Sequence, residues 1–174
     1  MIHDEGTNNK LLILFILDKL EMPINEELLL QICSIDNVWI PYFYCAQAIE
    51  ELVSGGLLSK STGPNRNLIS LTTDGRTCLS HFYNDIAASL REQITEFVKA
   101  HRINYRKKQE FVADYFRNPD GSFTVTLKIL EVTKPLFELK FNVATRSLAT
   151  SIYNSWNEKA PDVYCAIYET LIEN

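Results

Sequence analysis

Long apolar runs are absent from this chain of 174 residues. The run Leu11 to Leu17 has seven residues before Asp18, whereas a helix needs about 20 apolar residues to cross a bilayer. The residues before it are polar and not basic, and no small-residue cleavage site follows it, so the pattern is not that of a secretory signal. We therefore expect no membrane segment and a cytoplasmic protein.

Clusters of metal-binding or catalytic residues are also absent. The cysteines and histidines do not have the paired spacing of a zinc or redox site. They are Cys33, Cys45, Cys78, Cys165, His3, His81 and His101. No glycine-rich phosphate loop and no nucleophile elbow occurs. We expect buried, reduced thiols, which suit the cytoplasm, with no metal, no cofactor and no enzymatic activity.

Positive charge is missing from one long stretch. No lysine or arginine occurs between Lys19 and Lys60. The same stretch holds six carboxylates, at Glu21, Glu26, Glu27, Asp36, Glu50 and Glu51. The net charge of −5 argues against nonspecific coating of nucleic acid, because phosphate contacts need cations.

Hydrophobic residues make up 46% of the chain, which is ordinary for a folded protein. Helical spacing predicts a first helix with one buried face at residues 8–21 and a second at 25–32, capped by Asn25. A third helix is predicted within 39–58, where Gly55-Gly56 marks its end. Two strands around residues 63–65 then read as a hairpin.

A long apolar stripe follows the hairpin. Thr72 or Thr73 can cap a helix whose apolar spacing continues to about His101. A helix of roughly thirty residues would be about 45 Å long. One small domain cannot cover that length, so we expect the stripe from Leu79 to Val98 to pack on the C-terminal part or on a second copy of the chain.

The pattern changes at the cationic stretch 102–108, and we place a domain boundary there, giving domains 1–103 and 104–174. Alternating apolar residues predict three strands in a meander. They lie at 111–116, 123–129 and 137–143. Helices at 145–157 and 161–172 would cover the apolar face of this sheet, with Pro161 in the first turn of the last helix.

Two motifs give this layout a family resemblance. E-L-x-x-x-G-L at residues 51–57 and L-T-x-x-G-R at 71–76 resemble PadR-like and MarR-like winged helix-turn-helix regulators over about residues 8 to 100. The full layout looks more like an uncharacterised bacterial family known only as a domain of unknown function. The expected fold is α+β: an N-terminal winged helix-turn-helix, a long connecting helix, and a C-terminal three-stranded antiparallel meander with two helices.

The resemblance implies a cytoplasmic bacterial transcriptional regulator that binds double-stranded DNA as a homodimer. In that fold the third helix enters the major groove and the wing contacts the backbone or the minor groove. The implied contact residues are Tyr44, Gln47, Ala48 and Glu51 on the third helix, Lys60, Ser61, Asn65, Arg66 and Asn67 on the wing, and Arg76 after it. Because the third helix carries no cation, affinity would have to come mainly from the wing and flanking helices.

Other interpretations stay open at this point. Winged helices also serve as protein-protein interaction modules, and the acidic, aromatic third helix suits that role. Among Trp39, Tyr42, Phe43 and Tyr44 we expect core packing with one exposed ring. The C-terminal domain could bind an effector ligand or form a dimer, and the sequence does not distinguish these two roles.

Overall fold

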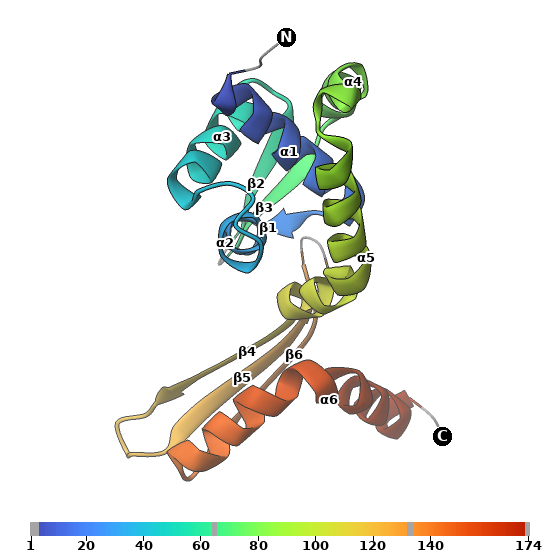
Figure 1. Ribbon diagram of the computed structural model, residues 1–174. Helices are drawn as coiled ribbons and strands as arrows, with labels where there is room; N and C mark the ends of the chain where they lie inside the picture. The colour runs from blue at the N-terminus through green and yellow to red at the C-terminus, as the bar shows by residue number, and fades with distance from the viewer. Residues whose placement is uncertain (1–3, 64–65, 132–133, 173–174) are drawn as a thin grey trace. The chain divides into compact units, whose positions relative to one another are not determined.

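The computed structural model describes residues 4–63, 66–131 and 134–172 (Figure 1). It divides into two compact units, Met1–Tyr105 and Arg106–Asn174, which we call unit 1 and unit 2. The helices and strands of unit 1 are α1 (Glu5–Leu20), β1 (Ile24–Asn25), α2 (Glu26–Gln31), the π-helix η1 (Ile32–Asp36), α3 (Tyr42–Ser54), β2 (Leu58–Gly63), β3 (Arg66–Leu71), α4 (Thr73–Phe82), the short 3-10 helix η2 (Tyr83–Asp85) and α5 (Ala88–Glu110). Helix α5 continues through the cationic stretch and runs five residues into unit 2.

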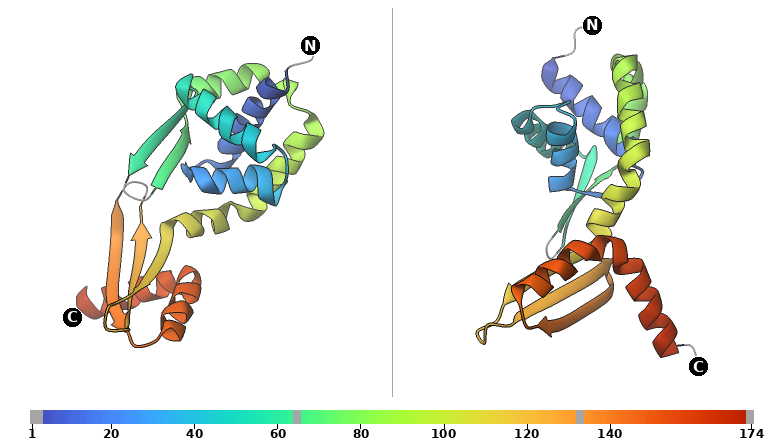
Figure 2. Two further views of the ribbon diagram at one scale, coloured as in Figure 1. Left: turned by 90° about the vertical axis from the view of Figure 1, so that its left-hand side faces the viewer. Right: turned by 60° about the horizontal axis from the view of Figure 1, so that its bottom comes forward.

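Helix α1 forms the centre of the unit 1 core. Every residue from Leu11 to Leu17 is at most 3% exposed. The prediction of a single buried face is therefore wrong, because this part of the helix is surrounded by protein, as expected for a helix that is apolar all round. Helices α3 and α4 both contact α1 and flank it on opposite sides (Figures 1 and 2).

Two predicted helix caps are confirmed. The Asn25 side chain accepts a hydrogen bond from the Glu27 N–H at 2.9 Å at the start of α2. The Thr72 hydroxyl accepts one from the Gly75 N–H at 3.0 Å at the start of α4. Each cap satisfies a backbone donor that has no partner within the first turn of the helix.

The end of α3 at its two glycines is also confirmed. Gly56 has a φ of +74°, a left-handed conformation that glycine adopts without a steric penalty. The N–H groups of Gly56 and Leu57 donate to the carbonyls of Val53 and Leu52. These two bonds form the Schellman motif, which turns the chain sharply from α3 into β2.

The hairpin is confirmed for the residues that the structure describes. Strands β2 and β3 pair antiparallel from Leu58 opposite Leu71 to Gly63 opposite Arg66. Strand β1 adds to the other edge of β3, with Ile24 opposite Ile69, so the sheet order is β1-β3-β2. A segment between α1 and α2 thus anchors the hairpin to the helices.

The single long helix predicted after the hairpin is wrong. Helix α4 ends at Phe82, and Ile86 is extended, with φ −80° and ψ 127°, before α5 starts. The Ile86 side chain is 0% exposed, so the break between α4 and α5 places this side chain in the core. Leu79, Ile94 and Val98, part of the stripe offered for dimerisation, are also in that core.

Unit 2 is a three-stranded antiparallel sheet with one long helix on its apolar face (Figure 2). Its elements are β4 (Phe111–Arg117), β5 (Phe123–Leu130), β6 (Pro135–Val143) and α6 (Arg146–Ile172). The predicted meander is confirmed, with the order β4-β5-β6. Val125, Leu127 and Ile129 of the central strand form the core together with Ala149, Trp156 and Ala160 of α6.

The two C-terminal helices predicted around Pro161 are in fact one. Helix α6 is continuous from Arg146 to Ile172 and contains Pro161 in its interior. Proline removes one backbone donor and crowds the carbonyl four residues earlier, so it bends a helix that packing keeps together. Figures 1 and 2 show this bend.

Candidate nucleic-acid interface

Helix α3 has an outward face that includes most of the residues predicted there. Tyr44 is 51% exposed, and Gln47 and Glu51 are exposed. Ala48 was expected outward, which is wrong: it is 4% exposed. Its small side chain lies on the inner face, where α3 contacts α1. Conversely, Tyr42, one of the four aromatic residues for which core packing was expected, is 58% exposed.

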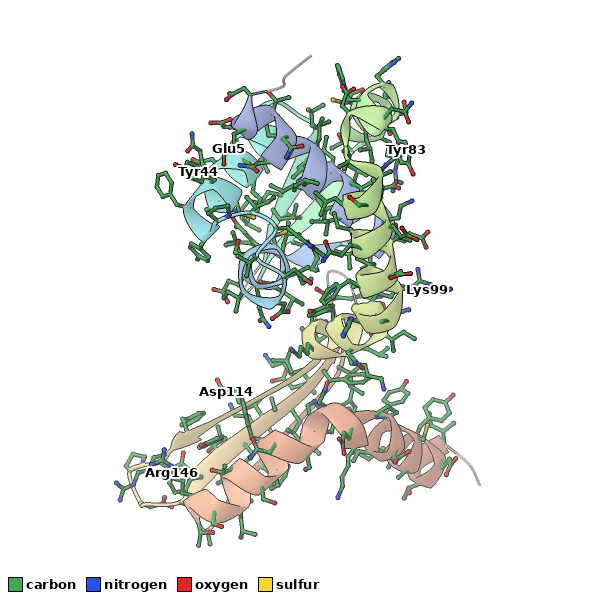
Figure 3. The ribbon with its side chains drawn as sticks, in the orientation of Figure 1. Glu5, Tyr44, Tyr83, Lys99, Asp114 and Arg146 are labelled. Atoms are coloured by element: carbon green, nitrogen blue, oxygen red, sulfur yellow. The ribbon has the colours of Figure 1, made fainter. Side chains whose placement is uncertain are left out.

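Polar groups on this face bind one another. Gln47 Nε2 donates to Glu51 Oε1 at 2.9 Å, and Lys10 Nζ of α1 lies 2.5 Å from Glu51 Oε2. Hydrogen bonds from Lys10 and Gln47 lower the pKa of Glu51. The three side chains line a hollow of about 260 Å³ with Tyr44 and Glu5, two residues that Figure 3 shows close together on α3 and α1. Carboxylates therefore face this hollow beside the single lysine.

The predicted wing residues are only partly described. Lys60 Nζ, on β2, lies 2.5 Å from Glu26 Oε2 at the start of α2. Ser61 on β2 and Asn67 on β3 are exposed. Arg66 begins β3, and Asn65 lies outside the described residues. Among the cations predicted on the wing, the structure gives contacts for Lys60, which is thus already paired with a carboxylate.

Arg76 lies away from the α3 face. Its Nη1 donates to Asp18 Oδ1 of α1 at 3.0 Å, on the side of α1 where α4 packs (Figure 1). Lys19 lies 3.5 Å from the other oxygen of the same carboxylate. The structure therefore does not bring Arg76 together with Tyr44 and Gln47. Arg76 contacts α1 near its C-terminal end, at Asp18, whereas Tyr44 and Gln47 lie near Glu5 and Lys10 at the other end of this helix.

The negative charge of the chain belongs to unit 1. Residues 1–105 hold eight lysines and arginines against thirteen aspartates and glutamates, which equals the net charge of −5 of the whole chain. Residues 106–174 hold nine of each. A ligand of unit 1 that carries phosphates must therefore approach an acidic body through a few cations.

Apolar side chains are exposed where η1 meets α3. The set consists of Ile35, Val38, Tyr42, Phe43 and Tyr44, each at least 51% exposed, and we call it the junction patch. The expectation of one exposed ring is wrong, because three rings point to solvent and only Trp39 packs inward, 5.5 Å from the Phe97 ring. The sequence signal that was missed is a pair of apolar residues, Ile35 and Val38, inside a polar turn.

The backbone under the junction patch is irregular. Residues 32–36 form a π-helix, a rare element that is frequent at functional sites. Val38 has a φ of +53°, which a β-branched residue adopts only at a cost. Trp39 Nε1 is buried without a hydrogen-bond partner. The fold thus tolerates strain where it exposes these apolar groups.

Unit 2 has a separate hollow of about 410 Å³ near the β4–β5 turn. It is lined by Tyr115, Phe116, Arg117, Gly121, Phe123 and Arg146; Figure 3 labels Arg146. The Tyr115 hydroxyl lies 3.2 Å from Thr150 Oγ1, and hydrogen bonds with Thr150 and Arg146 lower the pKa of Tyr115. Aromatic walls with two guanidinium groups can hold an anion, and none of these residues was predicted as a site.

Neither a metal site nor a membrane-spanning helix occurs in residues 4–63, 66–131 and 134–172. Within these ranges no three histidine, cysteine or acidic side chains gather as a metal site would require. The same ranges contain no helix with the length and apolar character needed to cross a membrane.

Together these observations define a mixed α+β protein with an acidic helical unit, an exposed third helix and a hairpin. A family model described as a domain of unknown function (DUF4364) matches residues 9–171, and the chain belongs to this family. No curated protein and no solved structure matches it. The expected membership of an uncharacterised family is confirmed, whereas the likeness to PadR-like and MarR-like regulators stays a proposal.

Proposed function

We propose that the protein is a winged-helix transcriptional regulator that binds double-stranded DNA as a homodimer through α3 and the β2–β3 hairpin. The observation that carries this proposal is the arrangement of unit 1. Three helical segments end in an exposed α3, a hairpin follows directly, and β1 completes a three-stranded sheet. This order is typical of winged helices, whose third helix is presented to the major groove.

The exposed side chains of α3 fit selective rather than strong contacts. The Gln47 amide has the donor and acceptor that read adenine in the major groove, and the Tyr44 hydroxyl can reach a phosphate. Sequence-independent affinity would come from Lys10, Lys60 and the wing residue Arg66.

The ion pairs limit this affinity without forbidding it. Lys10 and Lys60 must exchange Glu51 and Glu26 for phosphate oxygens. An exposed ion pair is worth only about 0–1 kcal/mol, and all four side chains are between 23% and 43% exposed, so the exchange itself costs little. The released carboxylates, however, would remain beside the DNA backbone and repel it.

The test is an anisotropy titration of labelled genomic fragments between about 50 and 200 mM salt. Lys60→Ala should weaken binding to all fragments and reduce the salt slope by about 1. Glu51→Gln should strengthen binding about two- to fivefold. Glu138→Gln is the matched control, since Glu138 is an exposed, ion-paired carboxylate of unit 2. Absence of binding at the lowest salt, or binding without salt dependence, would sink the proposal.

A second candidate function is a protein-interaction module, and the junction patch favours it. Five exposed apolar side chains on one short segment, in a unit with excess carboxylates, suit a partner segment that is apolar with basic flanks. Phe43 is 73% exposed, so Phe43→Glu should abolish such binding without unfolding the chain. A purified partner that binds wild type and Phe43→Glu equally well would exclude the patch as its site.

A further inference from the structure

The apolar face of the unit 2 sheet is covered unevenly. Val125, Leu127 and Ile129 of the central strand β5 are between 0% and 8% exposed. Their neighbours on β6 face the same side: Phe141 lies opposite Val125, Leu139 opposite Leu127, and Phe137 opposite Ile129. Phe137 and Leu139 are only half-buried, and Phe141 is 36% exposed. Helix α6 therefore leaves a strip of apolar side chains along β6 incompletely covered.

The last part of α6 has exposed apolar side chains. We call residues 161–172, from Pro161 onward, the arm. Its first turn is still on the sheet, because Tyr164 packs 5.9 Å from the Phe137 ring. Further on, Tyr168, Leu171 and Ile172 are 50%, 77% and 59% exposed. Their spacing places them on one side of the helix as a continuation of the Tyr164 row, so the end of the arm carries an apolar stripe that is at least half exposed.

Charge does not oppose contact between two copies of unit 2. Residues 106–174 hold nine lysines and arginines and nine acids, so the unit is neutral. The strands β4 to β6 with their turns, residues 111–143, hold four of each. Two copies of unit 2 can therefore approach without net repulsion.

We propose that a second copy of this chain covers the β6 strip with its arm, and that the exchange is reciprocal. One chain carries both the uncovered strip and the unused stripe, which is the condition for a closed two-fold interface. The proposal names the surface that forms the homodimer of the proposed function. It replaces the stripe from Leu79 to Val98, whose Leu79, Ile94 and Val98 are already in the unit 1 core.

The first experiment measures mass by light scattering on the full chain at about ten micromolar, without DNA. Wild type should be a dimer. Leu171→Glu should raise the dimer dissociation constant about tenfold or more. Leu148→Glu is the control, because Leu148 is 52% exposed in the first part of α6. A monomeric wild type, or a Leu171→Glu chain that dimerises as tightly as Leu148→Glu, would overturn the proposal.

The second experiment distinguishes an arm on a sheet from two arms packed together. Phe141→Lys places a cation on the strip, and Leu171→Glu places a carboxylate on the arm. Each variant alone should be monomeric, whereas an equal mixture should form a mixed dimer, in which one contact is native and the other joins opposite charges. Circular dichroism confirms that both variants are folded. Two folded monomers that do not combine would refute the arm-on-sheet contact, and since no DNA is present, this failure is distinguishable from a failed DNA titration.

Discussion

Replacing Gly75 with alanine is expected to destabilise unit 1, because the position has no space for a methyl group. A Cβ atom at Gly75 would overlap the carbonyl oxygen of Leu57 and lie 2.8 Å from Leu71 Cδ1. The Leu57 backbone cannot retreat freely: its N–H donates to Leu52, and its carbonyl accepts from the Thr72 N–H at 3.2 Å. The methyl group must therefore displace α4 from the turn that joins α3 to β2.

The magnitude follows from overpacking and from lost hydrogen bonds. Extra methyl groups in a packed site cost about 1–3 kcal/mol, and each hydrogen bond that is strained costs up to about 1 kcal/mol more. We expect a loss of about 2–3 kcal/mol, which lowers the melting temperature of a domain of this size by roughly 10–20 °C. Scanning calorimetry of the full chain and urea unfolding followed by circular dichroism measure both quantities.

Gly6→Ala is the matched control. Gly6 lies in the first turn of α1, where a Cβ atom meets only Asp4 Oδ2, at 3.4 Å, so alanine should be neutral or stabilising by up to about 1 kcal/mol. If Gly75→Ala unfolds within about 0.5 kcal/mol of wild type, the packing explanation is refuted.

Two further predictions concern ionisable side chains. Cys165 is exposed, contrary to the expectation of buried thiols, whereas Cys33 and Cys45 are buried. Alkylation of the native protein should therefore modify Cys165 first, and a hydrogen bond to Cys45 and burial also raise the pKa of Cys33. Equal alkylation rates by mass spectrometry would contradict this. Hydrogen bonds from Lys10 and Gln47 lower the pKa of Glu51, so this interaction stabilises the fold above the unfolded-state pKa of about 4.3 and is lost as the pH falls through the lower folded value. In Lys10→Met the pKa of Glu51 measured by NMR should rise, and an unchanged value would argue against the pair.

Local signals predicted the ends of elements well where one residue decides the geometry. Asn25, Thr72 and Gly56 each act through their own side chain or backbone freedom, and their effect is visible in the sequence. The strands of unit 2 were equally clear, because alternation with a period of two has one structural meaning. The hairpin followed from the polar segment between two short apolar runs.

Tertiary packing decided the features that the sequence did not reveal. No proline or glycine marks the break between α4 and α5, and the extended conformation of Ile86 is favoured only once a core exists to receive its side chain. Pro161 predicted a new helix, yet packing of Trp156 and Ala160 on the sheet keeps α6 continuous through it. The burial of Ala48 depends on where α1 crosses α3. The spacing of apolar residues within α3 cannot predict that position.

The candidate site was predicted as a set of residue types, but its chemistry depends on their partners. Lys10, Lys60 and Arg76 read as free cations in the sequence. Each lies within 3.0 Å of a carboxylate that is distant in the chain. Such pairings arise from the fold alone, so a sequence can show that cations exist but not that they are available to a phosphate.

One substitution on α3 separates its two candidate ligands by the sign of its effect. If α3 binds DNA, Glu51→Gln removes a repulsive carboxylate and releases Lys10, so binding tightens and its salt slope steepens as another phosphate contact forms. If the junction patch binds a basic, apolar protein segment, the same substitution removes an attractive charge, so binding weakens, while the apolar contacts themselves resist added salt. Because Glu51 is exposed and its loss leaves the core of α3 intact, the difference reports on the ligand rather than on folding.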